Sequence, residues 1–210
     1  MNTPEHPIFL ESIEYIRSPI GCTGLNSLQQ SVLERIIHSS GDLNMQASLR
    51  FSSTACEDAI HALKNGANIL TDTYMAEAAV SPVSKRTLNS NVKCILEMAP
   101  DFIEPSSKTR CAIGMQKMWL DMDKKEEFLA GPVVVIGSAP SALMTLLDLI
   151  QEGAKRPSLI IGMPVGFIGV SECKTRLLNS DCAYIVLEGS KGGASLAAAA
   201  TNALLRAAEN

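Results

Sequence analysis

Five short apolar runs, separated by longer segments of helical periodicity, constrain the fold of this chain more than any other feature of its sequence. The runs cover residues 67–70, 92–96, 133–136, 159–161 and 184–187. Each is largely apolar instead of alternating apolar with polar residues, as is typical of strands covered on both faces. Strands alternating with helices predict a parallel sheet with right-handed crossovers. We therefore expect an α/β fold.

The length and composition favour one globular domain over residues 1–210, with no repeat and no low-complexity linker. Hydrophobic residues make up 46% of the chain and charged residues 19%, which excludes a disordered protein. The net charge of −4 and the lack of a basic run argue against nucleic acid as a partner. No apolar stretch reaches the ~18 residues that span a bilayer, and the N-terminus does not read as a signal peptide. We expect a soluble, cytoplasmic protein.

The six cysteines form no CxxC pair, and no histidine stands at metal-ligand spacing from them. In a chain of this size such cysteines predict neither a disulfide framework nor a zinc site. We expect buried free thiols in a reducing compartment. The cysteines are Cys22, Cys56, Cys94, Cys111, Cys173 and Cys182.

The first helix that the apolar periodicity predicts covers residues 27–38. Asn26, with Gln29 three residues on, has the pattern of a capping box at its start. Gly41, just past its end, is a plausible C-terminal stop.

Four further helices are predicted from their start signals. One begins near Thr54, where Thr54 and Glu57 have the pattern of a capping box, and ends before Gly66. Another follows Ser107 and runs to the polar stretch 121–127. The last two begin near Pro140 and near Ala194, each directly after a strand.

Three junctions between a strand and the following loop contain the glycines that a ligand site at the sheet would need. The first is the Gly-Ser-Ala-Pro-Ser run that starts at Gly137, where N–H groups at a helix start favour an anion. The second contains Gly162 and Gly166, and the third is the Gly-rich loop around Lys191. All three should lie at the carboxyl ends of parallel strands, where open α/β sheets bind ligands. No nucleotide-binding fingerprint is present, so the turns indicate a substrate with carboxylates.

His38 is the titratable residue of greatest interest. It should lie in the last turn of the 27–38 helix, where the helix dipole favours its protonated form. Such an imidazolium suits a proton donor near neutral pH. His61 in mid-helix and His6 near the N-terminus have weaker claims, and no catalytic triad or HExxH pattern is present.

These segments together resemble the precorrin-8X methylmutase family, also called cobalt-precorrin-8 methylmutase, over nearly the whole chain. The most specific segment runs from Ile161 to Phe167 and is followed by Glu172 and Lys174. The other resembling segments are 35–42, 72–75, 109–110, 136–141 and 189–193. The chain departs from the usual family pattern at Ser138, Ser141, Cys173, Ala76 and Ala79.

The resemblance implies a flavodoxin-like, three-layer α/β/α fold with a five-stranded parallel sheet. It also implies a homodimer with a tetrapyrrole site near the subunit interface. The implied reaction moves a methyl group from C11 to C12 of the corrin precursor, an apparent 1,5-sigmatropic shift, without a cofactor or a metal ligand from the protein. The product is hydrogenobyrinic acid, or cobyrinic acid when cobalt is already present.

By the same resemblance, His38 is the catalytic residue that protonates or hydrogen-bonds to the substrate near the migrating methyl group. Arg110 and Lys191 are candidates for binding peripheral carboxylates. The residues that the resemblance and the loop positions assign to substrate binding are Ser12, Thr109, Arg110, Gly137, Ser138, Gly162, Pro164, Gly166, Lys191, Gly192 and Gly193.

Two other functions remain open from the sequence. The first is a corrinoid-binding or carrier relative that has kept the pocket and lost turnover. The second is a nucleotide- or flavin-binding module on the same fold, because a fold alone does not fix function. Conversion of substrate would separate the methylmutase from the carrier, and bound FMN or nucleotide would support the nucleotide- or flavin-binding module.

Overall fold

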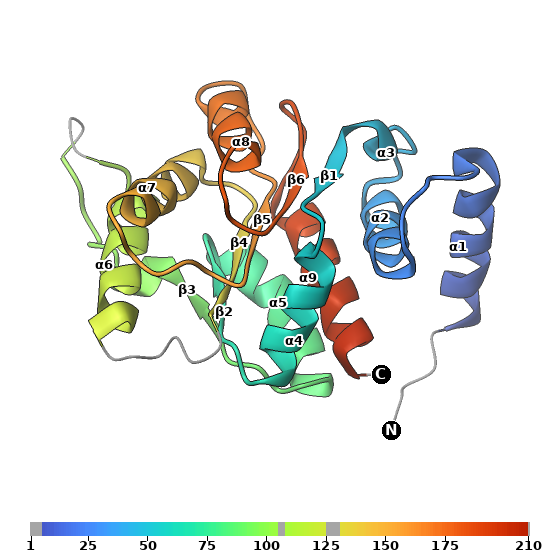
Figure 1. Ribbon diagram of the computed structural model, residues 1–210, viewed down its shortest axis with the longest axis horizontal. Coiled ribbons are helices and arrows are strands. Elements are labelled where there is room, and N and C mark those ends of the chain that lie inside the picture. The colour runs from blue at the N-terminus through green and yellow to red at the C-terminus, as the bar shows by residue number, and fades with distance from the viewer. Residues whose placement is uncertain (1–5, 105–107, 125–130, 210) are drawn as a thin grey trace.

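A mostly parallel sheet between two layers of helices forms the centre of the computed structural model, which describes residues 6–104, 108–124 and 131–209 (Figure 1). Within these residues the sheet has six strands in the order β1-β6-β5-β4-β2-β3. The strands are β1 (Leu49–Phe51), β2 (Ile69–Thr71), β3 (Val92–Cys94), β4 (Val133–Ile136), β5 (Leu159–Gly162) and β6 (Tyr184–Leu187). The α/β class predicted from the sequence is confirmed.

The five parallel strands, β2 to β6, are the five apolar runs of the sequence. Counted among themselves, they follow the order 2-1-3-4-5, which is the flavodoxin-like order. The prediction of a purely parallel, five-stranded sheet is wrong at one edge, where β1 pairs antiparallel with β6. The sequence pattern missed β1 because its three residues, Leu-Arg-Phe, have a charged centre and form no apolar run.

Helices cover both faces of the sheet, and the alternation of side chains along β4 shows why. Val133 and Val135 belong to one hydrophobic core, while Val134 and Ile136 belong to the other. One face is covered by α2 (Ser27–Ser40), α4 (Ala55–Lys64), α5 (Tyr74–Arg86) and α9 (Ala194–Glu209). The other is covered by the 3₁₀ helix η1 (Ile95–Met98), α6 (Arg110–Lys124), α7 (Pro140–Gln151) and α8 (Val170–Leu178).

Helix α1 (Pro7–Ile20) packs on α2 and lies at the edge of the molecule, away from the sheet (Figure 1). A short helix, α3 (Met45–Ser48), leads from α2 to β1. Arg17 of α1 donates two hydrogen bonds to the buried Glu34 of α2, at 2.7 and 3.0 Å. A bidentate pair of this kind fixes the position of α1 against α2.

The start and stop signals of α2 are confirmed. The Asn26 side chain accepts hydrogen bonds from the N–H groups of Leu28 and Gln29, and the Gln29 side chain accepts one from the Asn26 N–H. Gly41 ends the helix in the left-handed conformation with φ 67°. The helix continues two residues past the predicted end, to Ser40.

The predicted capping box at Thr54 is wrong, although α4 begins at the next residue and ends before Gly66, as predicted. The Thr54 side chain caps no N–H group, because its Oγ1 donates to the Asp58 carboxylate at 2.6 Å. Helices α7 and α9 begin at Pro140 and Ala194, as predicted. Helix α6 begins at Arg110; Ser107 and residues 125–127 of the predicted segment lie outside the described residues.

The thiols and the surface agree in part with the sequence analysis. All six cysteines are free and four are buried, but Cys22 is exposed and Cys111 is intermediate, so the prediction of buried thiols fails for these two.

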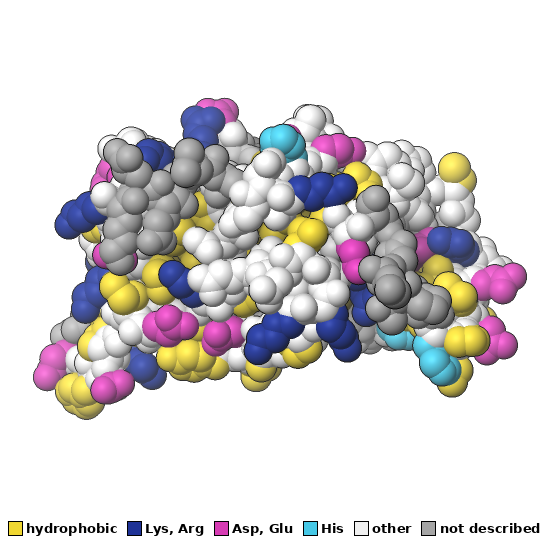
Figure 2. Space-filling view, turned by 90° about the horizontal axis from the view of Figure 1, so that it is seen from below, with side chains coloured by type: hydrophobic (Ala, Val, Ile, Leu, Met, Phe, Trp, Pro, Cys, Tyr) yellow, Lys and Arg dark blue, Asp and Glu magenta, His cyan; other side chains and the backbone are white. Residues whose placement is uncertain are grey.

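Basic and acidic side chains are interspersed over the face shown in Figure 2. Within the described ranges, no helix combines the length and the apolarity needed to cross a membrane.

Candidate functional site

The strand order places the candidate site at the carboxyl ends of the parallel strands. In an open α/β sheet, ligands bind at the point where neighbouring strands lead into connections that diverge to opposite sides. Here that switch point lies between β2 and β4. The three glycine-containing loops follow β4, β5 and β6 at this same edge.

A buried carboxylate occupies the first of these loops. Asp72 follows β2 directly, and one of its oxygens, Oδ2, accepts hydrogen bonds from the N–H groups of Gly137, Ser138 and Ala139 at 3.1, 2.6 and 2.7 Å. Burial raises the pKa of the Asp72 carboxyl, and the three N–H groups act against that rise. The expectation that these N–H groups are free for an anion of the substrate is therefore wrong, since the protein supplies the anion itself.

The loops after β5 and β6 are locked together by backbone contacts. The Gly193 N–H donates to the Met163 carbonyl at 2.9 Å, and the Gly166 N–H donates to the Ser190 carbonyl at 3.1 Å. Gly137 connects the first loop to this pair, because a Cβ there would lie 2.6 Å from the Ala194 Cα. The three loops therefore form one continuous surface at the carboxyl edge.

Substitution of Gly192 by alanine is expected to disrupt this surface. A Cβ on Gly192 would lie 2.1 Å from the Met163 carbonyl oxygen, and neither group is a flexible side chain that could move aside. We expect Gly192→Ala to lower the free energy of unfolding by roughly 2–4 kcal/mol. Urea denaturation measures this loss. Gly153→Ala is the matched control for steric crowding, since no atom lies within 4 Å of a Cβ there, although its positive φ gives it a smaller penalty of its own.

Lys174 holds the β6 loop through two hydrogen bonds. Its side chain lies on α8, is 1% exposed, and donates from Nζ to the carbonyls of Gly189 and Lys191, both at 2.7 Å. Burial lowers the pKa of the Lys174 ammonium to about 8. The resemblance placed Lys174 in a characteristic segment, but the sequence alone gave it no role.

The lowered pKa of Lys174 predicts a rise in stability with pH. Between about 8 and 10.5 the unfolded chain holds this proton while the folded chain has released it, so folding becomes more favourable as pH increases through that range. We expect the wild type to gain about 2–3 kcal/mol over Lys174→Met between pH 7 and 10. Urea denaturation of both proteins at the two pH values measures the gain. Equal pH dependence of the two would contradict the prediction.

Lys191 connects the third loop to the end of α2. Its Nζ donates to the Asp42 carboxylate at 2.5 Å, and this hydrogen bond lowers the pKa of Asp42. Asp42 follows Gly41, the residue that ends the helix bearing His38. The contact therefore brings the β6 loop to the end of α2 that carries His38.

His38 lies in the last turn of α2, as predicted, and its side chain is exposed. Its ring packs edge-on against Phe9 of α1, with 5.1 Å between the ring centroids. His38 and Ser12 both line a cavity of about 660 Å³ between α1 and α2, a volume within the usual range for ligand pockets. The rest of its lining is mostly apolar and comes from Ile8, Glu11, Tyr15, Ile16, Ile37, Gly41 and Leu43.

The other predicted site residues lie away from this cavity. Thr109 stands just before α6, where its Oγ1 lies 2.6 Å from the Ser141 hydroxyl of α7. Arg110, the first residue of α6, donates from Nε to the Pro100 carbonyl at 2.9 Å. Gly162 and Pro164 are buried at the end of β5. The structure thus brings Ser12 to His38, and leaves Thr109 and Arg110 at the β4 end of the edge.

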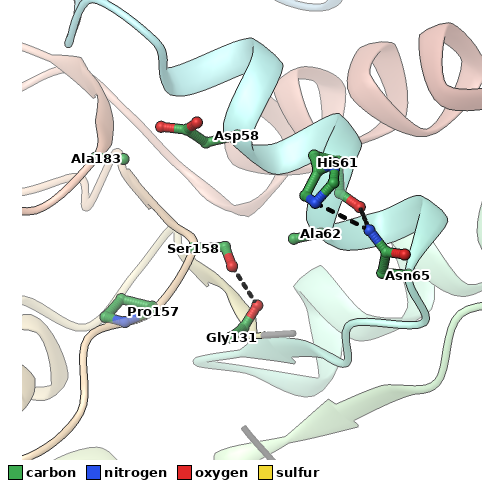
Figure 3. Close-up of a pocket in the computed structure, with 8 residues that line it drawn as sticks. All are labelled: Asp58, His61, Ala62, Asn65, Gly131, Pro157, Ser158 and Ala183. Carbon is green, nitrogen blue, oxygen red and sulfur yellow. Dashed lines mark hydrogen bonds between the residues drawn. The ribbon is translucent and has the colours of Figure 1, made fainter. Parts of the chain in front are cut away.

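Another cavity, of about 720 Å³, opens at the opposite, amino-terminal end of the strands, and its lining residues are drawn in Figure 3. Its lining includes His61 and Asn65 of α4 and Ser158, which precedes β5. These polar groups are satisfied locally. The Asn65 amide hydrogen-bonds the His61 ring and carbonyl, and the Ser158 hydroxyl donates to the Gly131 carbonyl (Figure 3). Open α/β sheets bind ligands at the carboxyl ends of their strands, and the Lys191–Asp42 contact joins the end of α2 to the β6 loop there, so we place the candidate site at the carboxyl end.

Three residues of the site were not found from the sequence. Asp72 and Asp42 entered only within segments of the resemblance, and Lys174 was not assigned a contact. A polar residue directly after a buried strand is a usable signal for Asp72. No local pattern predicts that Lys191 would reach Asp42, which is 149 residues away in the chain.

Comparison with known proteins identifies the family. The family model described as CbiC, precorrin-8X methylmutase, matches residues 7–207. A cobalt-precorrin-8 methylmutase of Synechocystis is 34% identical, covering 96% of this chain and 95% of the relative. A precorrin-8X methylmutase of Pseudomonas aeruginosa is 36% identical, covering 94% and 93%.

A solved structure shows the same fold over nearly the whole chain. The crystal structure of a precorrin-8X methylmutase from Thermus thermophilus superposes with a TM-score of 0.83 at 33% identity, covering 96% of this chain and 95% of that one. The match of sequence and the match of fold each extend over nearly the whole chain, and the chain belongs to the precorrin-8X methylmutase family.

Proposed function

We propose that this chain is an isomerase of corrin biosynthesis that moves a methyl group from C11 to C12 of precorrin-8X or of its cobalt form. The product is hydrogenobyrinic acid or cobyrinic acid. Membership of the methylmutase family supports the reaction. The location of the proposed active site rests on one observation. His38, at the C-terminal end of α2, lines a cavity together with Ser12.

His38 is the proposed proton donor. It lies in the last turn of α2, and its exposed ring can reach a ligand and donate a proton to it. Protonation of the macrocycle near C11 would draw electron density from the bond that the methyl group leaves, and the proton would return to the imidazole once the new bond at C12 has formed. The rearrangement is an isomerisation, so no atom is gained or lost and no cofactor is required.

The loops at the carboxyl edge are the proposed binding surface for the periphery of the macrocycle. Gly162, Pro164 and Gly166 shape the β5 loop, and Lys191, Gly192 and Gly193 shape the β6 loop. Gly137 and Ser138 shape the β4 loop, and Thr109, which contacts Ser141 in the first turn of α7, lies with Arg110 at the start of α6. A substrate with several carboxylates suits a surface that carries cations at separate points, because each contact restrains the orientation of the ring.

A homodimer is the proposed assembly. The resemblance implies one, and the described surface exposes large apolar side chains that an isolated subunit would leave in water. On α1 these include Tyr15, 76% exposed, and in the β5 loop they include Phe167 and Ile168, 90% and 89% exposed. We also place the protein in the cytoplasm, where its six free thiols would stay reduced.

Mixing the purified protein with precorrin-8X and recording the visible spectrum tests the reaction. The expected result is replacement of the substrate spectrum by that of hydrogenobyrinic acid. The parallel experiment with the cobalt form identifies the preferred substrate, since the relatives carry both names. Binding of either substrate without conversion would support the corrinoid carrier. Bound FMN or nucleotide in place of a corrinoid would support a nucleotide- or flavin-binding module.

A further inference from the structure

Lys174 is an unusual residue to find inside the candidate site. Its ammonium is buried, and its only hydrogen-bond partners among the described residues are the carbonyls of Gly189 and Lys191. No carboxylate in the described part of the chain lies within ion-pair distance of it. Glu188, the residue before Gly189, pairs with Arg50, and Asp42 pairs with Lys191.

A buried ammonium without a counter-ion is costly, because two neutral carbonyls replace only part of the hydration that the charge loses. A methionine or leucine would fill the same space without this cost. Packing alone therefore does not explain why a charged side chain occupies this buried position.

The direction of the two peptide groups supplies that reason. No described peptide bond is cis, and in a trans peptide the C=O and the N–H of the same unit point in opposite directions. Since the carbonyls of Gly189 and Lys191 point at the ammonium, the N–H groups of Ser190 and Gly192 point away from it. Within the described ranges, neither N–H has a hydrogen-bond acceptor in the protein.

The β6 loop thus differs from the β4 loop in its charge balance. The three N–H groups of the β4 loop already receive the Asp72 carboxylate. The β6 loop has two N–H groups without an acceptor on one side and the Lys174 ammonium on the other, while the Lys191 side chain is paired with Asp42. Backbone N–H groups without an acceptor, with a positive charge on the other side of their peptide units, favour an anion.

We propose that Lys174 is a positioning residue that fixes the 189–192 loop so that the N–H groups of Ser190 and Gly192 receive a peripheral carboxylate of the substrate. This inference rests on the proposed function, because it takes the carboxylated macrocycle as the ligand. Lys174 touches no substrate itself. It acts by holding two carbonyls and by offsetting the charge of the bound carboxylate through the peptide groups.

Binding of hydrogenobyrinic acid and of its fully amidated analogue, measured by fluorescence or absorbance titration, tests the proposal. We expect Lys174→Met to weaken binding of the acid on the order of ten- to a hundredfold and to leave binding of the amide within about twofold. Lys85→Met, which removes an exposed charge from α5, is the matched control and should change neither. Binding of the acid by folded Lys174→Met as tightly as by the wild type would overturn the inference and leave the proposed function standing.

A second measurement needs no variant, in case Lys174→Met does not fold. Titration of ¹⁵N-labelled wild type with hydrogenobyrinic acid should move the amide proton signals of Ser190 and Gly192 downfield, with smaller changes at Gly137 and Ala139. Binding without movement at Ser190 and Gly192 would overturn the inference alone. A wild type that binds neither the acid nor the amide would overturn the proposed function, and the inference with it.

Discussion

His38→Ala is expected to lower the rate of conversion of precorrin-8X by roughly 10²–10⁴-fold, the usual contribution of a general acid. Binding of hydrogenobyrinic acid should change by less than about tenfold, because the loops that hold its carboxylates are not altered. The variant should fold normally, since the His38 side chain is exposed and its only ring contact in the described structure is with Phe9. Single-turnover absorbance measurements give the rate, and equilibrium titration gives the affinity.

The matched control for this prediction is His61→Ala. His61 lies in the last turn of α4, so its predicted mid-helix position is wrong, and it lines a cavity that opens at the amino-terminal end of the strands. Conversion by His61→Ala should match that of the wild type. If His38→Ala converts substrate at the wild-type rate, His38 is not the acid, and if His61→Ala is the inactive protein, the site lies at the other end of the sheet.

Asp72→Ala is expected to lower the free energy of unfolding by about 2–5 kcal/mol. The substitution removes the oxygen that accepts three N–H groups, and two of those groups, on Gly137 and Ala139, are buried. Each buried donor left without an acceptor costs roughly 1–3 kcal/mol. Urea denaturation at pH 7 measures the loss, which is a large fraction of the stability of a typical domain.

Two further variants define what the loss at Asp72 means. Asp72→Asn keeps an oxygen that can accept the same N–H groups, so it should lose less than Asp72→Ala. Asp181→Ala removes an exposed carboxylate paired with Arg156, and should change stability by less than about 1 kcal/mol. A loss at Asp72→Ala no larger than at Asp181→Ala would show that water satisfies the loop, and that Asp72 is not its structural anion.

The sequence predicted the parts of the fold that depend on local patterns. The five apolar runs became the five parallel strands, two of them with the predicted bounds, because strands buried on both faces need unbroken apolar residues. The capping box at Asn26 and the stop at Gly41 were also local signals. The edge strand β1 was missed because three residues at the rim of a sheet need no apolar pattern.

The candidate site could be predicted only as a set of loops, because its contacts join residues far apart in the chain. The glycines after β4, β5 and β6 showed where the backbone must turn. The sequence could not show that Asp72 fills the first loop, since the contact spans 65 to 67 residues. Nor could it show that Lys174 lies beneath the third loop, because a lysine in a helix is usually exposed.

The structure of the protein with hydrogenobyrinic acid bound tests the central claim most directly. We predict that the macrocycle lies over the loops that follow β5 and β6, with the C11–C12 edge facing the His38 imidazole and a peripheral carboxylate at Ser190 and Gly192. The opposite result is a ligand in the cavity lined by His61 and Ser158 at the amino-terminal end of the strands. That position would contradict both the location of the site and the role of His38.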